Sequence, residues 1–571
     1  MSAQPLSGAQ LICTALRRAG IECVFGLPGT QTVALYEALR TSSLRSIVAT
    51  HELSAAMMAN GYYRSSGRVA ALLTIPGPGF TWALTGLAEA ALDSAALLHL
   101  TTQPAHAPGQ QFQLQALDQA AIAAALTKAQ HRIDHADEVT PVLTIAHAEA
   151  CTGEPGPVLV QVAREALRAS APLSAAMTGP PAPAEAEVAA LDATVAALSQ
   201  ASRCVLLLGQ GCAGAGAGEP ARRLAETLSA AVVTTTSGRG VVAEDHPLSL
   251  GFELGGNECA TLNALIEASD LVLAVGCKFS HNGSRGFELR IAQDKLIHVD
   301  ACADVLGANY PARHLIRADA PTFLASLLQR LGPVPRPGGF GEGEIAQWRA
   351  RCRAESLHHR VEPRIHGVPS GRPQAFFDAL RHTLPRDACL VTDSGQHQGL
   401  ARRHFRVLCP RGLIVPTNLQ SMGFGISAAI GARLANPDRP VVALIGDGGL
   451  AMSGLELLTA VRERLRLTVI VFVDGAYGLI RMQQLATSGH VYDTRFNGPD
   501  LAAFAASIGA THMRLDGAPE TTLATAIAAP GVTLVEVRVG DTLPMHWLRT
   551  RSVARGVLGS RLFAWLRRQR G

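Results

Sequence analysis

Short apolar runs recur along the whole chain, each ending in Gly, Pro or Asp and each followed by a longer stretch with helical periodicity. A buried strand followed by a helix is the βαβ unit, in which successive strands run parallel. The runs form three groups, which begin and end with CVFGLP and GPVLVQV, CVLLLG and LIHVD, and CLVTDSG and TLVEVRV. The pattern therefore predicts an α/β chain of three doubly wound parallel-sheet domains.

Two linkers are expected between these groups. Residues 177–190 are rich in Pro and Ala, and residues 331–344 are rich in Pro and Gly. Such compositions suit exposed connections. We therefore expect an N-terminal domain at 1–175, a central domain at 190–330 and a C-terminal domain at 345–545, followed by a tail at 546–571.

The composition indicates a globular protein, and the sequence predicts that it is cytoplasmic. Hydrophobic residues make up 48% of the chain and charged residues 17%, which argues against disorder. The net charge of +4 is too small to require a nucleic-acid partner. The eleven cysteines include no CxxC pair, so we expect reduced thiols, and the N-terminus lacks the pattern of a secretory signal.

No membrane span is expected, although two long stretches, 69–88 and 412–432, lack charge. Pro, Gly and polar residues interrupt both, so we interpret them as buried turns and helices. The tail is rich in Arg and contains no acidic residue. It is interpreted as a solvated or subunit-packing helix, and the alternative is peripheral contact with an acidic surface such as anionic lipid headgroups.

Carboxylates follow two strands of the third group. Asp447 lies between Gly446 and Gly448, directly after VVALI, and Asp474 follows TVIVFV 27 residues later. Ligands of open α/β sheets bind at the carboxyl ends of strands. Two carboxylates on neighbouring strand ends form the hard oxygen site that Mg²⁺ prefers and usually shares with phosphate oxygens. A third polar strand end, DSGQHQ at 393–398, lies in the same domain.

In the first domain, Glu52 lies where a strand ends and a helix is expected to begin. A glutamate there is most often a capping or dipole residue.

The motifs together resemble those of the thiamine-diphosphate (ThDP) enzymes of the acetolactate synthase type. The resemblance covers nearly all of residues 6–545. It rests on FGLPG at 25–29, THE at 50–52, PGPG at 76–79, LTK at 126–128, EPGPVLVQV at 154–162, DHPLSLG at 245–251, TDSGQHQ at 392–398, SMGFGISAAIGA at 421–432 and GDGGLAMSGLEL at 446–457.

The resemblance implies a ThDP and Mg²⁺ site in the C-terminal domain. It implies that Asp447 and Asp474 bind the metal through their side chains and Ala476 through its carbonyl, where the family often has Asn at the second position. It implies that the Gln420 carbonyl accepts from the 4′-amino group and that Met422 holds the cofactor in a V shape. The remaining cofactor contacts that it implies are Pro28, Pro78, Ser394, Gly395, Gln396, His397, Gly446, Gly448, Gly449, Gly478 and Leu479.

The resemblance also implies a site shared between subunits. Glu52 matches the acid that hydrogen-bonds the pyrimidine N1′ and so activates the cofactor. In this family that acid and the metal site come from different subunits, so a homodimer is the minimum unit and a homotetramer is the alternative. Gln115 matches a Gln beside the reacting carbonyl. From the residues alone, Gln115 is equally well read as a polar residue on a surface helix.

The central domain departs from the family pattern. GQGCAG at 209–214 fits the dinucleotide fingerprint, but the acidic residue expected after the next strand is missing, so NAD is not expected. The family's anabolic members hold FAD here partly through an Arg-Phe-Asp-Asp-Arg stretch. This chain has Lys278-Phe279-Ser280-His281-Asn282 instead, so FAD stays open and the residues weigh against it.

The substrate pocket also departs from the family pattern. Asn282 replaces an Arg that would bind the acceptor's carboxylate, and Arg285 is a candidate substitute. Gln483 stands in place of a Trp that favours 2-oxobutyrate, Thr30 in place of a Gly, and Arg164 in place of a Lys. The substrate is therefore not determined by the resemblance.

Three functions follow. The first is decarboxylation of pyruvate or a related 2-oxo acid, with transfer of the hydroxyalkyl carbanion to an acceptor carbonyl. The second is simple decarboxylation or C–C cleavage that releases an aldehyde; decarboxylases of that type carry a His pair in the first domain, whereas the His pair here is His358-His359. The third is a ThDP-binding paralogue without activity, against which the joint presence of Glu52, Asp447 and Asp474 argues.

Overall fold

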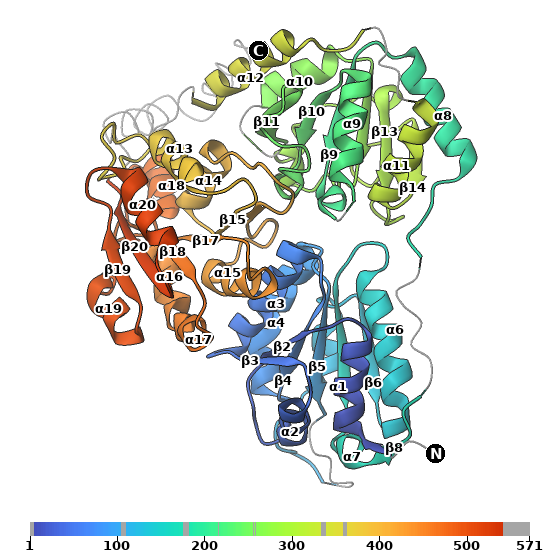
Figure 1. The fold of residues 1–571 in the computed structure, drawn as a ribbon, viewed down its shortest axis with the longest axis vertical. Coiled ribbons are helices and arrows are strands. Elements are labelled where there is room, and N and C mark those ends of the chain that lie inside the picture. Colours follow the sequence, from blue (N-terminus) through green and yellow to red (C-terminus); the bar gives the residue numbers. More distant parts are fainter. Residues whose placement is uncertain are drawn as a thin grey trace.

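The computed structural model describes residues 5–103, 110–174, 182–214, 216–254, 256, 259–332, 338–357 and 362–540. The Arg-rich tail at 546–571 and the pair His358-His359 lie outside the described residues. Figure 1 shows three lobes, each built around one six-stranded parallel sheet with helices on its faces. The predicted fold class, three doubly wound parallel-sheet domains, is confirmed.

The N-terminal sheet has the strand order β3-β2-β4-β5-β7-β6. Its strands are β2 (Cys23–Gly26), β3 (Arg45–Val48), β4 (Ala70–Thr74), β5 (Leu97–Thr102), β6 (Ala129–Ile133) and β7 (Pro157–Val162). The helices of this lobe are α1 (Gly8–Arg18), α2 (Val33–Thr41), α3 (Glu52–Ser66), α4 (Pro78–Leu92), α5 (Gln119–Ala123), α6 (Val139–Cys151) and α7 (Arg164–Arg168). A short antiparallel pair, β1 (Leu6–Ser7) and β8 (Ser170–Ala171), ties the two ends of the lobe together.

The central sheet has the order β11-β10-β9-β12-β13-β14. Its strands are β9 (Cys204–Leu208), β10 (Ala231–Thr234), β11 (Ser249–Glu253), β12 (Leu271–Val275), β13 (Leu296–Asp300) and β14 (His314–Arg317). Its helices are α8 (Val188–Gln200), α9 (Gly218–Leu228), α10 (Cys259–Glu267), α11 (Ala320–Leu331) and α12 (Glu342–Leu357).

The C-terminal sheet has the order β16-β15-β17-β18-β20-β19. Its strands are β15 (Cys389–Thr392), β16 (Leu413–Ile414), β17 (Val441–Gly446), β18 (Leu467–Val473), β19 (Thr511–Arg514) and β20 (Val532–Arg538). Its helices are α13 (Pro373–Thr383), α14 (Gln396–His404), α15 (Phe424–Ala435), α16 (Asp447–Ser453), α17 (Leu457–Arg462), α18 (Gly478–Ser488), α19 (Leu501–Ile508) and α20 (Pro519–Ala528).

The inner strands are buried on both faces, which explains their continuous apolar sequences. Strands β4, β5 and β9 contain only buried residues, and β17 and β18 are buried except at their last residue. Helices cover both faces of such sheets, so no alternation of polar residues is needed. In the C-terminal sheet the chain order reverses between β15 and β17. A crevice at such a reversal is the usual ligand site of an open α/β sheet.

Helices α3 and α15 pack the N-terminal lobe directly against the C-terminal lobe (Figure 1). A Cβ atom at Gly61 would lie 2.1 Å from the Ala428 carbonyl oxygen, and one at Gly431 would lie 1.9 Å from the Met58 carbonyl oxygen. Only glycine allows this approach of the two helix backbones. The helix pair therefore fixes how the two outer sheets sit relative to each other.

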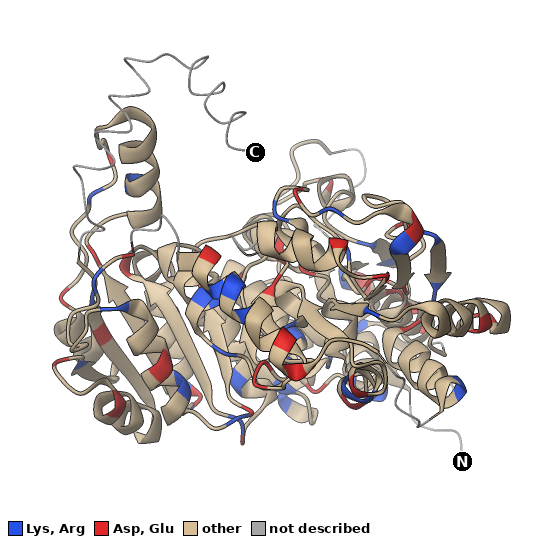
Figure 2. Cartoon of the chain, turned by 90° about the horizontal axis from the view of Figure 1, so that it is seen from above, with Lys and Arg blue, Asp and Glu red and all other residues tan. Residues whose placement is uncertain are grey.

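None of the helices in the described ranges combines the length and the hydropathy needed to span a bilayer. In Figure 2, basic and acidic residues are interspersed over the face that is seen. Most of the eleven cysteines are buried.

Candidate functional site

Asp447 is the first residue of α16 and lies directly after β17. Its carboxylate accepts hydrogen bonds from the backbone amides of Gly448 (2.9 Å), Asp474 (3.2 Å) and Gly475 (2.8 Å). Burial raises the pKa of Asp447. These bonds join the ends of β17 and β18, so the structure brings together the two carboxylates that the sequence pairs.

The second carboxylate is held just as closely. Asp474 accepts from the backbone amide of Ala476 at 3.2 Å through Oδ1. A Cβ atom at Gly478 would lie 2.2 Å from Asp474 Oδ2, so only glycine fits beside that oxygen. Among the residues that the structure describes, no group of three or more His, Cys, Asp or Glu side chains could hold a metal. Two carboxylates and a backbone carbonyl are instead what a Mg²⁺ ion needs when phosphate oxygens complete its shell.

His397 lies in the first turn of α14, next to this carboxylate pair. Cβ atoms at Gly395 and Gly446 would lie 2.8 and 3.3 Å from the imidazole Cε1, so the loops after β15 and β17 meet at the ring. Burial lowers the pKa of His397 to about 4, and its buried Nε2 has no hydrogen-bond partner among the described residues. The backbone amides at the amino ends of α14 and α16 suit a bound anion. His397 Nε2 can donate to such an anion in the tautomer that carries its proton there.

Asp393 is a residue of this site to which the sequence assigned no role. It is fully buried after β15 and accepts from the backbone amides of Ser394 (2.7 Å) and Gly423 (2.9 Å). Burial raises the pKa of Asp393 to about 7. A Cβ atom at Gly449 would lie 2.2 Å from its Oδ2. Asp393 thus connects three loops. Like Asp447, it directly follows a buried strand, and this position in the sequence could have marked it as a candidate site residue.

The loop before α15 lies over Gly448. Gln420 has a φ of +65°, a conformation that is uncommon for a residue with a side chain. The Met422 methyl group would lie 3.3 Å from a Cβ atom at Gly448. The Ser421 amide donates to Glu89 of α4 at 3.0 Å, which anchors the loop to the N-terminal lobe. Met422 therefore faces the loop that begins at Asp447.

Glu52 is the first residue of α3 and is 7% exposed. The capping role falls to the preceding residue, because His51 Nδ1 accepts from the Leu53 amide at 3.1 Å. The Glu52 Oε2 atom is buried and has no hydrogen-bond partner among the described residues. The capping contact therefore does not come from Glu52, although Glu52 lies in the first turn of α3, where the helix dipole favours an acid. An unpaired buried carboxylate oxygen is costly and calls for a functional explanation.

The PGPG loop lies beside Glu52. A Cβ atom at Gly79 would lie 3.0 Å from Glu52 Oε1. One at Gly77 would lie 2.9 Å from the Cβ of Gln115. Glu52 and Gln115 thus flank the same loop, with Pro78 between the two glycines. Gln115 lies in a turn before α5, so its interpretation as a surface-helix residue is wrong.

Two further residues for which cofactor contacts are predicted lie after β2 and after β18. Pro28 follows β2 and precedes Gly29, which packs against Ile75 of the loop after β4. Leu479 is the second residue of α18, which follows the loop after β18 that contains Asp474. The predicted residues therefore form two half-sites in one chain: one around Glu52 and one around Asp447. Glu52 makes no hydrogen bond to the second half-site in the described structure.

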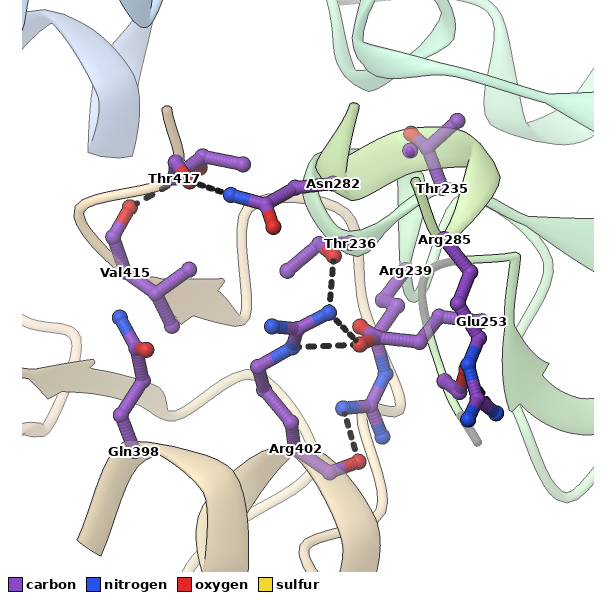
Figure 3. Close-up of polar contacts among 12 residues, drawn as sticks. Thr235, Thr236, Arg239, Glu253, Asn282, Arg285, Gln398, Arg402, Val415 and Thr417 are labelled. Atoms are coloured by element: carbon purple, nitrogen blue, oxygen red, sulfur yellow. Dashed lines mark hydrogen bonds and ion pairs between the residues drawn. The ribbon is translucent and has the colours of Figure 1, made fainter. Parts of the chain in front are cut away.

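Figure 3 shows the seam between the central and C-terminal lobes, where substrate-binding differences were expected. The Asn282 side-chain amide donates to the Thr417 carbonyl at 2.5 Å. Arg285 points away from Asn282, donating to the Gly256 carbonyl at 3.3 Å (Figure 3). Arg285 therefore does not take the place of the Arg that Asn282 replaces. Gln483 and Thr30 are exposed.

A cavity of about 570 Å³ opens at the carboxyl ends of β9, β12 and β13. The hydroxyl and carboxylate groups that line it include those of Thr235, Thr236, Ser237, Asp300 and Asp319. Burial raises the pKa of Asp300 to about 6. Asp300 is the last residue of β13. The dinucleotide fingerprint expects an acid after β10, the next strand along the chain from the Gly-rich turn, so the sequence did not point to Asp300.

The cations that line this cavity already contact protein acceptors. Lys278 pairs with Glu154 at 2.5 Å, and Arg64 pairs with Asp93 at 2.7 Å. Arg411 donates to the backbone carbonyls of residues 63, 64 and 213. The cavity therefore has space and hydroxyl groups for a nucleotide, whereas its Lys and Arg side chains already contact groups of the protein.

Comparison with known proteins agrees with this arrangement. Three models of the thiamine pyrophosphate enzymes match the chain: the N-terminal TPP binding domain over residues 6–122, the central domain over 191–327 and the C-terminal TPP binding domain over 393–537. The acetolactate synthase isozyme 1 large subunit of Escherichia coli is 32% identical, over 93% of this chain and 94% of its own length.

Two other relatives are similar over most of their length. The acetolactate synthase large subunit of Lactococcus lactis is 30% identical, over 91% of this chain and 89% of its own. The probable 2-ketoarginine decarboxylase AruI of Pseudomonas aeruginosa is also 30% identical, over 93% and 94%. With the carboxylate pair, the unpaired glutamate and the two half-sites in place, these matches show that the chain belongs to the thiamine pyrophosphate enzymes and is a relative of the acetolactate synthase large subunits.

Proposed function

We propose that this chain is a ThDP- and Mg²⁺-dependent enzyme of the acetolactate synthase type. It decarboxylates pyruvate or a related 2-oxo acid and transfers the remaining hydroxyalkyl group to an acceptor carbonyl. The observation that carries the proposal is the carboxylate pair of Asp447 and Asp474 at the amino end of α16, close to the amino end of α14. These groups suit a diphosphate and its Mg²⁺ ion.

The residues of the two half-sites would have different roles in binding and catalysis. Bound ThDP supplies a carbon nucleophile for the oxo carbon of the substrate. Asp447, Asp474 and the Ala476 carbonyl would hold the metal, and Met422 would support the cofactor over Gly448. The free oxygen of Glu52 is suited to hold a proton at the pyrimidine N1′, and its burial excludes water from that contact.

A second candidate is a 2-oxo acid decarboxylase or C–C lyase that releases an aldehyde. The observation that favours it is that Asn282, which replaces the Arg expected to bind the acceptor's carboxylate, donates to the Thr417 carbonyl. The similarity to the probable 2-ketoarginine decarboxylase agrees with this candidate. The acetolactate synthase relatives favour carboligation.

Product analysis separates these candidates. Purified protein is incubated with ThDP, Mg²⁺ and pyruvate, and the products are identified by NMR. We expect acetolactate, and no pyruvate consumption when either cofactor is left out. Acetaldehyde as the main product would favour the lyase. If pyruvate is not consumed, a panel of other 2-oxo acids follows, and no ThDP-dependent turnover of any of them would contradict both enzymatic candidates.

We propose that the active unit is a homodimer, or a homotetramer built from such dimers, as the resemblance to the family implies. The buried Oε2 atom of Glu52, which has no partner among the described residues of its own chain, supports a site shared between subunits. Co-expression of one chain carrying Glu52→Gln with another carrying Asp447→Asn tests this. Each chain carries a different affinity tag, so that mixed dimers can be purified through both tags. If sites are shared, a mixed dimer has one site with intact Glu52 and Asp447, so it should have about half of the wild-type activity. Activity no higher than that of each variant alone would place both half-sites in one chain.

FAD in the central cavity stays a proposal. The cavity's size and its hydroxyl partners support it, and the commitment of Lys278, Arg64 and Arg411 to protein groups argues against it. The visible absorbance of the purified protein decides the question, because an oxidised flavin is yellow.

We also propose domain boundaries at 1–175, 190–330 and 345–545. The free thiols support the proposal that the enzyme works in the cytoplasm.

A further inference from the structure

We propose that Gln31 is a positioning residue: it fixes the side-chain amide of Gln115 so that the NH₂ group of Gln115 faces the substrate and donates to the oxo oxygen of the 2-oxo acid. The inference rests on the proposed function. It assigns a role to a residue in the turn between β2 and α2 that the sequence did not single out.

The contact that carries the inference joins two turns far apart in the chain. Gln31 Nε2 donates to Gln115 Oε1 at 2.5 Å, across 84 residues, and both side chains are half-buried. A side-chain amide has one carbonyl oxygen and one NH₂ group. Because Gln31 occupies the oxygen, the NH₂ group of Gln115 is the end that stays available to a ligand.

The backbone of Gln115 is held in place as well. Its φ is +59°. The Cβ atom of Gln115 packs against Gly77, because a Cβ atom added at Gly77 would lie only 2.9 Å from it. The same three-residue loop places Gly79 against Oε1 of Glu52. The amide of Gln115 is therefore fixed on one side of the loop whose other side holds the carboxylate proposed to act on the cofactor.

A donor in this position matches the charge that develops in the reaction. When the oxo carbon is attacked, a C–C bond forms and the electron pair of the C=O double bond moves onto oxygen. An N–H group aimed at that oxygen stabilises the negative charge, whereas an amide oxygen turned toward it would repel the charge. One such donor typically contributes about 10²- to 10³-fold to kcat.

Two substitutions test the amide orientation with the full-length protein and pyruvate as the probe. In Gln31→Glu, the new carboxylate can only accept, so it draws the NH₂ group of Gln115 and turns the amide oxygen to the substrate. We expect kcat to fall about 100-fold. In Gln31→Ala the amide of Gln115 loses its partner but can still donate, so we expect a fall of only about 10-fold. The concentration of ThDP that gives half-maximal activity should stay within about twofold of wild type in both.

The control is Gln293→Glu, which makes the same chemical change on an exposed side chain of the central lobe. It should behave like the wild type. A second readout separates a positioning role from a structural one: in a Gln115→Ala background, Gln31→Ala should cause little further loss, because residues that act as a unit are not additive.

Three results would overturn the inference: full activity of Gln31→Glu, equal losses in Gln31→Glu and Gln31→Ala, or an undiminished effect of Gln31→Ala when Gln115 is already Ala. Each requires an active wild type, so each is distinct from a failure of the proposed function. If the wild type turns over no 2-oxo acid with ThDP, the proposed function fails and this inference falls with it.

Discussion

Replacing Glu52 by Gln is expected to lower kcat by about 10³-fold, within the range that a positioned acid or base contributes. The amide keeps the size of the side chain but cannot exchange a proton with the pyrimidine N1′. The Oε2 atom that has no partner in the described structure is the atom that would carry this proton. The measurement is the steady-state rate with pyruvate at saturating ThDP and Mg²⁺.

Because Glu52 does not cap its helix, the fold should survive this substitution. His51 supplies the capping contact, so we expect the thermal unfolding midpoint to stay near that of the wild type. Glu165→Gln is a matched control, since Glu165 also lies in the first turn of a helix but is exposed. A Glu52→Gln enzyme with near-normal kcat would contradict the assigned role, and a collapsed unfolding midpoint would make Glu52 a structural residue.

Replacing Asp447 by Asn is expected to abolish cofactor retention at ordinary Mg²⁺ concentrations. The charge of a metal ligand is lost, and the new NH₂ group faces a backbone donor in either orientation: Gly448 if it replaces Oδ1, or Asp474 and Gly475 if it replaces Oδ2. Loss of a mere supporting contact already costs about 10- to 100-fold in metal affinity, so removal of a direct ligand should cost about 100-fold or more. Titration of Mg²⁺ into EDTA-treated protein, with activity and bound ThDP as readouts, measures the effect.

The same strand offers the control. Asp438 is exposed in the turn before β17, at the opposite end of the strand from Asp447. Asp438→Asn makes the same change of charge and should leave the Mg²⁺ requirement unaltered. Equal Mg²⁺ titration curves for the two variants would remove Asp447 from the metal site.

The sequence predicted most of the fold because its parallel strands are buried on both faces. Their continuous apolar runs, such as VVALI and TVIVFV, can be read without knowing what packs against them. Asp447 and Asp474 could be paired for the same reason: parallel strands end at one edge of a sheet, so residues that follow neighbouring strands meet.

Other parts of the site depended on contacts that no local pattern reveals. Asp393 looked like any polar strand end until the structure showed its bonds to Ser394 and Gly423. The pairing of Gln31 with Gln115 joins two turns from different parts of the chain.

The sequence by itself determined the three parallel sheets, the carboxylates at their strand ends and the motifs that tie the chain to ThDP enzymes. Only the tertiary structure decided which polar atoms have partners: that His51 and not Glu52 caps α3, that Asn282 is bonded to Thr417, and that Gln31 holds Gln115. The physical reason is the range of the interactions. Burial and strand periodicity are repeated along a segment and can be read there, whereas a hydrogen bond depends on two groups that distant segments bring within about 3 Å of each other.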